Sequence, residues 1–185
     1  MARADEPGIA DPVDEAMTVA APTFETFFLA EYRSMVLLAA AVSGSRNDAE
    51  DIAATAMGRL QRDWSRISAY DKPGAWLRRV TINLALSHKR RFIAEAWALL
   101  RLGPRDDAVL APVRSEHEPL WAAVAALPAN QRAAVALRYL EDRSTEEIAE
   151  ILEISASTVR THMERAHRTL RAALRDAGFD PKDKR

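Results

Sequence analysis

The sequence predicts an all-α protein built as two small helical bundles joined by a flexible linker. Glycine accounts for only 6 of the 185 residues and alanine is abundant, a balance that favours helix. Apolar residues recur at helical spacing in two blocks, 24–98 and 119–178. The stretch between them, 99–118, keeps no apolar period and contains Pro104 and Pro112, so it is the expected linker.

Three helices are expected in the first block. Aromatic residues from Phe24 to Tyr32 form one face of an opening helix that ends near the Ser-Gly-Ser at 43–45. Asn47 or Asp48 can cap the second helix, which continues to Trp64. A loop is expected over 65–73, followed by a third helix whose apolar stripe begins at Trp76.

The second block ends in two helices separated by a short turn. Pro119 suits a first helical turn, and Pro128 separates two further helices. Ser144 and Glu147 have the spacing of a capping box, which predicts the start of a short helix. After the turn at 153–155, a longer helix carries a one-sided apolar stripe and a basic opposite face. A short helix, a three-residue turn and a longer basic helix are typical of a helix-turn-helix.

The net charge of −1 hides an uneven distribution. Residues 1–23 are acidic and proline-rich without an apolar period, which predicts a disordered leader, and 179–185 form a short tail. Bases gather in 78–91 and again in 160–175, whereas acids dominate 141–153. Two separate basic stretches in a neutral chain indicate two places where phosphates are contacted, although either could be a solvated helix face.

Composition excludes several classes of protein. The chain has no cysteine, which removes disulfides and thiolate chemistry, and its four histidines are too scattered for a metal site on one helix. No glycine-rich nucleotide loop or hydrolase signature occurs. No run approaches the roughly 18 uncharged apolar residues of a membrane span, and no secretory signal begins the chain. We therefore expect a cytoplasmic, non-enzymatic protein without membrane insertion, metal or cofactor.

The string EIAEILEISASTVRTHMERAHRTLR at 147–171 resembles region four of bacterial sigma factors. It also resembles the DNA-binding domain of LuxR-type regulators, so it does not choose between them. In the first block, FETFFLAEYRSMV, DAEDIAATAMGRLQRDW and WLRRVTINLALSHKRR are similar, in order, to the helices of region two in extracytoplasmic-function sigma factors. The combination, without a region-three domain, resembles this class, and in particular its SigE-like actinobacterial members.

The resemblance implies a role for each part of the chain. The second helix would bind the β′ clamp of RNA polymerase through Asp48, Glu50, Asp51, Ile52, Arg59 and Arg62. The third helix and the loop before it would melt and hold the −10 promoter strand through Tyr70, Trp76, Arg78, Arg79, Asn83, Lys89, Arg90 and Arg91. The helix-turn-helix would read the −35 duplex through Ser155, Ser157, Thr158, Arg160, Thr161, Arg165 and Arg168. Core polymerase, promoter DNA and an anti-sigma factor are the partners that the resemblance implies.

Some of these residues could instead have a purely structural role. For Trp76, which heads an apolar stripe, a place in the core is favoured over base stacking. Acids at the start of the second helix also suit the helix dipole. Spacing gives Arg78, Lys89, Arg90 and Arg91 no base preference, so phosphate contact is expected of them.

Departures from the family pattern fall in three places. Ala54 and Thr55 replace a polar pair in the second helix, which also carries Gly58 at a cost of about 1 kcal/mol relative to alanine. Glu153 occupies a bend where glycine is usual, a position that favours positive φ. Ser87 stands where the third helix commonly has aspartate.

Two other functions remain open from the sequence. A LuxR-like regulator would need a ligand pocket or a phosphoacceptor in a βα pattern, and the first block shows no strand-like run. A helical nuclease would need converging carboxylates and a metal, and Asp48, Glu50 and Asp51 do not all share one helix face.

Overall fold

The described chain is entirely helical apart from its turns. The computed structural model describes residues 23–101, 118–176 and 178. Their helices are α1 (Phe24–Ser43), α2 (Ala49–Arg62), α3 (Trp64–Ile67), α4 (Pro73–Arg101), α5 (Glu118–Ala126), α6 (Ala129–Leu140), α7 (Thr145–Leu152) and α8 (Ala156–Asp176). The all-α prediction is confirmed. Most of the expected leader, residues 102–117 of the expected linker and the tail lie outside the described residues.

Local signals fix both ends of α1. Thr23 caps its start, where the Thr23 side chain accepts a hydrogen bond from the Thr26 amide at 3.3 Å. Gly44 ends it in the left-handed region at φ 78°, and its amide donates to the Ala40 carbonyl at 2.9 Å. The helix therefore ends where the Ser-Gly-Ser sequence predicts.

The expected loop at 65–73 is partly wrong, because residues 64–67 form the short helix α3. Trp64 begins it, with its ring 5.8 Å from that of Phe24 and 5.2 Å from that of Phe27. Ile67 is fully buried at its other end. Packing of these apolar side chains onto α1 gives a stable turn of helix where local sequence alone indicated a loop.

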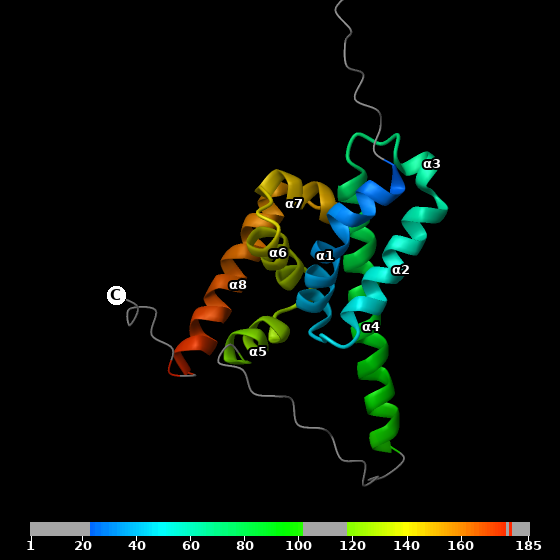
Figure 1. Cartoon of the computed structure of the whole chain (residues 1–185). Coiled ribbons are helices and arrows are strands. Elements are labelled where there is room, and N and C mark those ends of the chain that lie inside the picture. The colour runs from blue at the N-terminus through cyan, green and yellow to red at the C-terminus, as the bar shows by residue number, and fades with distance from the viewer. Residues whose placement is uncertain (1–22, 102–117, 177, 179–185) are drawn as a thin grey trace, which may run out of the picture.

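The helix α4 is longer than expected at both ends. It begins at Pro73, whose fixed φ and missing amide suit a first helical turn, and it ends at Arg101. Its last residues extend into the range predicted as linker. Figure 1 shows its lower half running past the other helices of the first block.

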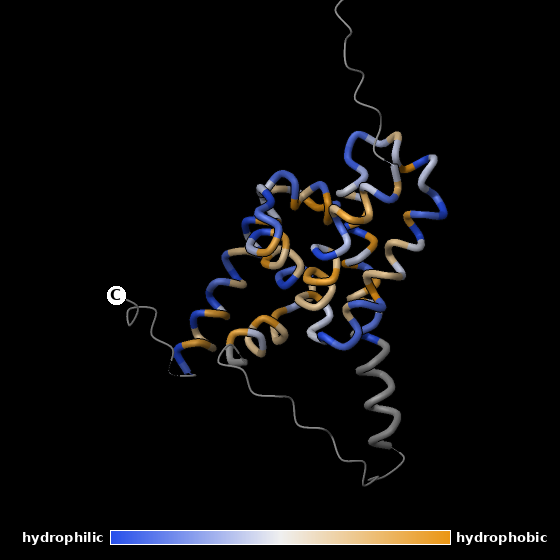
Figure 2. Tube along the Cα trace, viewed as in Figure 1, coloured by the Kyte–Doolittle hydropathy of each residue, from blue (hydrophilic) through white to orange (hydrophobic). Residues whose placement is uncertain are grey.

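At the centre of the molecule lies α1, in contact with α2, α4, α5 and α6 (Figure 1). Among the described residues, it is the helix with the length and hydropathy to cross a membrane. Its Met35 and Leu38 are fully buried against neighbouring helices, and its Glu31 pairs with Arg78 of α4. Figure 2 shows apolar stretches of α1 and of its neighbours at this centre, so part of the hydropathy of α1 belongs to the core.

The two blocks share one core. Leu38 and Leu77 of the first block belong to the same buried cluster as Leu137, Ile148 and Val159 of the second. Contacts of α1 with α6 and of α4 with α7 close the interface between the blocks. The helix-turn-helix therefore lies directly against the first block (Figure 1).

Candidate nucleic-acid interface

The capping box predicted at the start of α7 is confirmed. The Glu147 amide donates to Ser144 Oγ at 3.1 Å, and the Ser144 amide donates to Glu147 Oε2 at 2.8 Å. The bond from the Ser144 amide, followed by that from Arg143, lowers the pKa of the Glu147 carboxyl. These bonds fix the start of a helix of only eight residues.

The turn between α7 and α8 is tight. Glu153 adopts the left-handed conformation at φ 55°, as expected for a bend position where glycine is usual. The Ile154 amide returns to the Ala149 carbonyl at 3.0 Å, which ties off the end of α7. The bend therefore keeps the helix-turn-helix geometry although Glu153 has a charged side chain where glycine would have only a hydrogen atom.

One face of α8 is packed and the other is exposed. Val159 and Ala166 are fully buried beneath the helix. Among the side chains predicted to contact the −35 duplex, Thr158 is half-buried. The others are exposed, namely Ser155, Ser157, Arg160, Thr161, Arg165 and Arg168. Ser155 Oγ accepts the Thr158 amide at 3.1 Å and lies 2.8 Å from the hydroxyls of Ser157 and Thr158, so it orders the start of α8.

Among the residues predicted to contact the −10 strand, Tyr70, Asn83 and Arg90 are exposed. Trp76 is half-buried and packs against the shared core, which agrees with its structural reading. Lys89 and Arg91 lie on α4, with side chains outside the described part of the chain. Arg78 and Arg79 point to the second block.

The structure corrects the expectation that Arg78 is an exposed phosphate contact. Its guanidinium is buried, with the residue 4% exposed, between Glu31 at 2.8 Å and Glu141. It also donates to the Gly74 carbonyl at 3.0 Å. A Cβ at Gly74 would lie 2.7 Å from the same guanidinium, so a larger residue there would displace the Arg78 side chain. Sequence spacing shows a basic helix face but not the carboxylates that a second block brings to it.

Arg79 is bound to the end of α7. Its guanidinium donates to the carbonyls of Ile151 at 3.0 Å and Glu150 at 2.9 Å, and it pairs with the Glu153 carboxylate. Asn83, one turn further along α4, lines a cleft of about 90 Å³ together with Glu153 and other residues of the turn. Arg79 thus contacts the helix-turn-helix, and Asn83 lies beside it with its side chain exposed.

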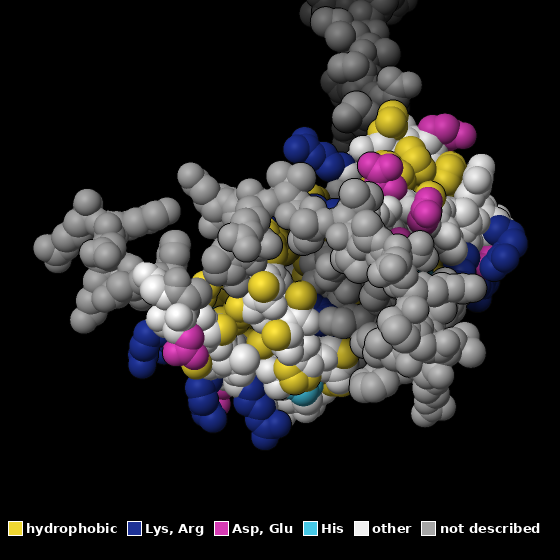
Figure 3. All heavy atoms as spheres, turned by 90° about the horizontal axis from the view of Figure 1, so that it is seen from below, with side chains coloured by type: hydrophobic (Ala, Val, Ile, Leu, Met, Phe, Trp, Pro, Cys, Tyr) yellow, Lys and Arg dark blue, Asp and Glu magenta, His cyan; other side chains and the backbone are white. Residues whose placement is uncertain are grey.

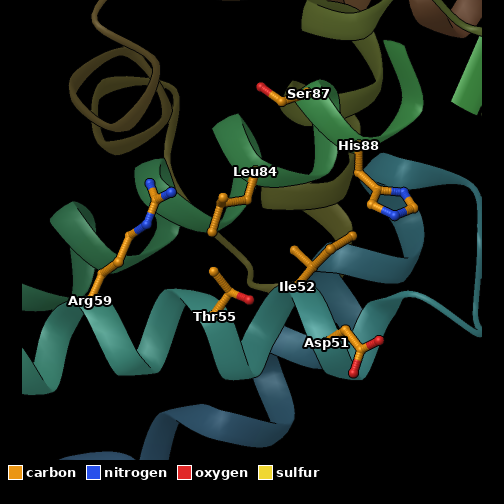
Figure 4. A pocket seen from close by; sticks show the side chains of 7 residues that line it. All are labelled: Asp51, Ile52, Thr55, Arg59, Leu84, Ser87 and His88. Carbon is orange, nitrogen blue, oxygen red and sulfur yellow. The ribbon is translucent and has the colours of Figure 1, made fainter. Parts of the chain in front are cut away.

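A groove of about 420 Å³ separates α2 from α4. Figure 4 shows Ile52, Thr55 and Arg59 of α2 on one side, with Leu84 and His88 of α4 opposite. Asp51 and Ser87 complete its lining, and His88 Nδ1 lies 3.6 Å from the Asp48 carboxylate. Several residues predicted to bind polymerase therefore meet at one groove. Two family departures, Thr55 and Ser87, line it as well, and no sequence signal pointed to His88.

A second groove, also of about 420 Å³, was not anticipated from the sequence. It lies between α5, α6 and α8, and its most exposed apolar side chains are Leu120, Trp121, Tyr139 and Leu140. The Tyr139 hydroxyl lies 2.7 Å from His167 Nε2, and Arg46 lies 5.6 Å above the Trp121 ring. Figure 3 shows apolar side chains gathered on the underside of the molecule, with Lys and Arg side chains along the edge. Such an exposed apolar surface is typical of a protein-binding site.

In the part of the chain that the structure describes, no group of three or more His, Cys, Asp or Glu side chains is placed to hold a metal ion.

Comparison with known families matches the two blocks separately. Residues 27–92 match the family model for Sigma-70 region 2, and residues 117–170 match the one for Sigma-70 region 4. The chain therefore carries two regions of the Sigma-70 family, region 2 followed by region 4.

Individual relatives agree. The chain is 35% identical over 129 residues to the RNA polymerase sigma-E factor of Streptomyces coelicolor, covering 69% of this chain and 72% of that protein. It is 29% identical over 147 residues to the ECF RNA polymerase sigma factor SigW of Bacillus subtilis, covering 72% and 79%. The chain belongs to the extracytoplasmic-function RNA polymerase sigma factors. The LuxR-like alternative is not favoured.

Two solved structures share the fold at 20% identity. One is the sigma factor RpoE in complex with the anti-sigma factor NepR from Bartonella quintana, with a TM-score of 0.67 over 82% of this chain and 96% of that one. The other is CnrH in complex with the cytosolic domain of CnrY, with a TM-score of 0.59 over 83% and 88%.

Proposed function

We propose that this sigma factor is a non-catalytic, cytoplasmic subunit that brings core RNA polymerase to promoters through two contact surfaces, one for each promoter element. The single observation that carries the proposal is the helix-turn-helix of α7 and α8, whose exposed polar face lies on the same chain as the region 2 bundle. We assign polymerase and −10 binding to residues 24–98 and −35 binding to residues 119–178.

The −35 duplex would be read by α8. Ser157, Arg160 and Thr161 lie on its exposed face near the helix start, where side chains of a recognition helix reach base edges. Arg165 and Arg168 lie one and two turns further and suit backbone phosphates. Ser155 and Thr158 order the start of the helix through their hydroxyl bonds.

The −10 strand would be held along α4. Asn83 can pair with the edge of an unstacked base, and Tyr70 can stack beside it. Arg79, Lys89, Arg90 and Arg91 would contact phosphates. Trp76 would support these residues from the core, and Arg78 would fix the start of α4 through its ion pairs.

Core polymerase would bind at the groove between α2 and α4. Its lining combines the carboxylate of Asp51 and the guanidinium of Arg59 with apolar Ile52 and Leu84, which suits a charged partner helix with apolar side chains. The other α2 residues assigned to this surface, Asp48, Glu50 and Arg62, lie beside it on the same element or its cap. An anti-sigma protein is the expected regulator, since the sigma factor RpoE of Bartonella quintana, which shares the fold, is described in complex with one.

Reconstituted transcription tests the proposal. The chain is added to core RNA polymerase with a randomised promoter library, and run-off products are sequenced. We expect transcripts enriched for one pair of promoter elements at fixed spacing, and loss of this enrichment with Arg160→Ala. Arg171→Ala, at an exposed arginine of the same helix without an assigned role, is the matched control. No association with core polymerase, or transcription without enrichment, would overturn the proposal.

A further inference from the structure

The carboxylate of Glu146 on α7 lies beside a side chain assigned to the −35 duplex. Its Oε1 accepts a hydrogen bond from Arg160 Nη2 of α8 at 3.4 Å. Both side chains are exposed, 70% for Glu146 and 64% for Arg160. The pair therefore lies on the outer surface of the helix-turn-helix, where Arg160 would meet DNA.

Local structure decides which acid of α7 is available to α8. The first turn of α7 contains two of them, Glu146 and Glu147. Glu147 is used within its own turn of chain, where it accepts from the Ser144 amide at 2.8 Å and from Arg143 at 3.1 Å. This capping box also holds the backbone of the first turn in place. Glu146 is thus carried on a fixed backbone, with its carboxylate bonded to the neighbouring helix.

Arg160 has a second acid on its own helix. Glu164 follows it by four residues, the spacing at which two side chains of a helix can pair. Side chains lean towards the N-terminus of their helix, so Arg160 leans towards the turn and α7. An arginine that precedes its acid by four residues is also the weaker order of such a pair. Among the residues that the structure describes, Arg160 pairs with Glu146 and not with Glu164.

The bond to Glu146 leaves Arg160 able to read a base. A guanidinium has five N–H donors in a planar fork, so one bond to a carboxylate leaves a parallel pair of donors free. Such a pair fits the O6 and N7 acceptors of guanine, which is the commonest specific contact in the major groove. A phosphate, in contrast, is repelled by the carboxylate that holds the guanidinium. Glu146 therefore favours a base edge over the DNA backbone as the partner of Arg160.

We propose that Glu146 is a specificity-determining residue, which positions Arg160 on a guanine of the −35 duplex and disfavours its contact with phosphate. This inference rests on the proposed function, because it takes α8 as the helix that reads the duplex. The negative charge of Glu146 lowers affinity for every DNA sequence. The same charge raises the difference in affinity between the correct base pair and the others, since the guanidinium is held where it can discriminate.

Base preference at each position of the −35 element tests this role. Holoenzyme reconstituted from core polymerase and the full chain transcribes a library of promoters randomised at that element, and the products are sequenced. We expect one position enriched in guanine, and loss of that enrichment with Arg160→Ala. Glu146→Ala should reduce the enrichment at this position about two- to fivefold, the factor that an exposed ion pair contributes. Glu164→Ala removes an exposed acid of α8 and is the matched control, with every preference unchanged.

Binding of the holoenzyme to two −35 duplexes, one with the guanine and one with adenine in its place, separates positioning from a structural role. Glu146→Ala should raise affinity for the adenine duplex and narrow the ratio of the two affinities. A structural role would instead lower both affinities and keep their ratio. In an Arg160→Ala background, Glu146→Ala should no longer change the ratio, because the side chain that it positions is absent.

Three results would overturn the inference. The first is an unchanged preference in Glu146→Ala at the position that Arg160→Ala alters. The second is an effect of Glu146→Ala on the ratio that persists without Arg160. The third is a base other than guanine at the position that depends on Arg160. Failure of the proposed function is distinct from these, since the original protein would then show no −35 preference, or one that Arg160→Ala leaves intact.

Discussion

Arg132 of α6 offers a direct test of how the second block is held together. It heads the fully buried side chains by volume and is 2% exposed. Its Nη1 donates to the Ala125 carbonyl in the last turn of α5 at 2.7 Å and to the Leu127 carbonyl, just after that helix, at 3.2 Å. Burial lowers the pKa of the guanidinium. We interpret Arg132 as a cap on the end of α5, held inside the protein at a desolvation cost.

The variant Arg132→Met removes the donor and keeps the volume. Loss of a buried hydrogen bond from a charged donor costs about 1.5–3 kcal/mol, and methionine recovers roughly 1.5 kcal/mol through apolar burial. Loss of both bonds, offset in part by this burial, is expected to lower the free energy of unfolding by about 2 kcal/mol. For a chain of this length the melting temperature should fall by about 4–8 °C.

Urea denaturation followed by circular dichroism measures this change, with thermal melting as a second observation. Arg138→Met is the matched control, because Arg138 lies on the same helix, is exposed, and donates to the Arg143 carbonyl at 2.9 Å. We expect a change within about 0.5 kcal/mol for it, as for most surface substitutions. An Arg132→Met chain as stable as the original protein would refute the capping interpretation, since burial of the cation would then cost as much as its bonds contribute.

Three further predictions concern DNA and pH. Arg160→Ala and Arg165→Ala should each weaken −35 duplex binding by roughly 1–3 kcal/mol, and loss of a phosphate contact should lower the salt slope by about one; unchanged titrations at several salt concentrations would exclude the contact. Asn83→Ala should leave −35 binding intact and impair promoter melting measured by permanganate footprinting, whereas a lower melting temperature of the protein would indicate a structural role. Because the Glu147 pKa is lowered in the folded state, its stabilisation is present above the unfolded pKa of about 4.3 and is lost as pH falls through the folded value. Glu147→Gln should therefore flatten the acid side of the stability profile, although solvent around this half-exposed carboxylate keeps the effect small.

Local signals predicted much of the fold. The capping box at Ser144, the left-handed bend at Glu153 and the end of α1 at Gly44 all follow from the sequence, because each depends on residues within one helical turn. The side predicted for Asn83 was also correct, since helical periodicity alone places it outward.

Tertiary contacts explain what the sequence could not show. The turn of helix at Trp64 depends on aromatic packing from α1. The burial of Arg78 depends on Glu141, which is remote in the chain and reaches α4 only through the contact between the blocks. Arg132 and the apolar groove at Trp121 likewise depend on how α5, α6 and α8 are placed. Pairing across long sequence distances leaves no periodic signal in either partner.

The shared core has a consequence for a chain that waits for polymerase. Met35 and Leu38 of α1 and Leu137 of α6 are fully buried in one cluster, so the free chain has a single cooperative unit where two small bundles alone would each be marginal. Such a unit resists proteolysis because local opening exposes little cleavable chain. A partner that drew the two blocks apart would have to cover these apolar surfaces itself. The protein would thus be most open to proteolysis while the blocks are apart and no partner covers these surfaces.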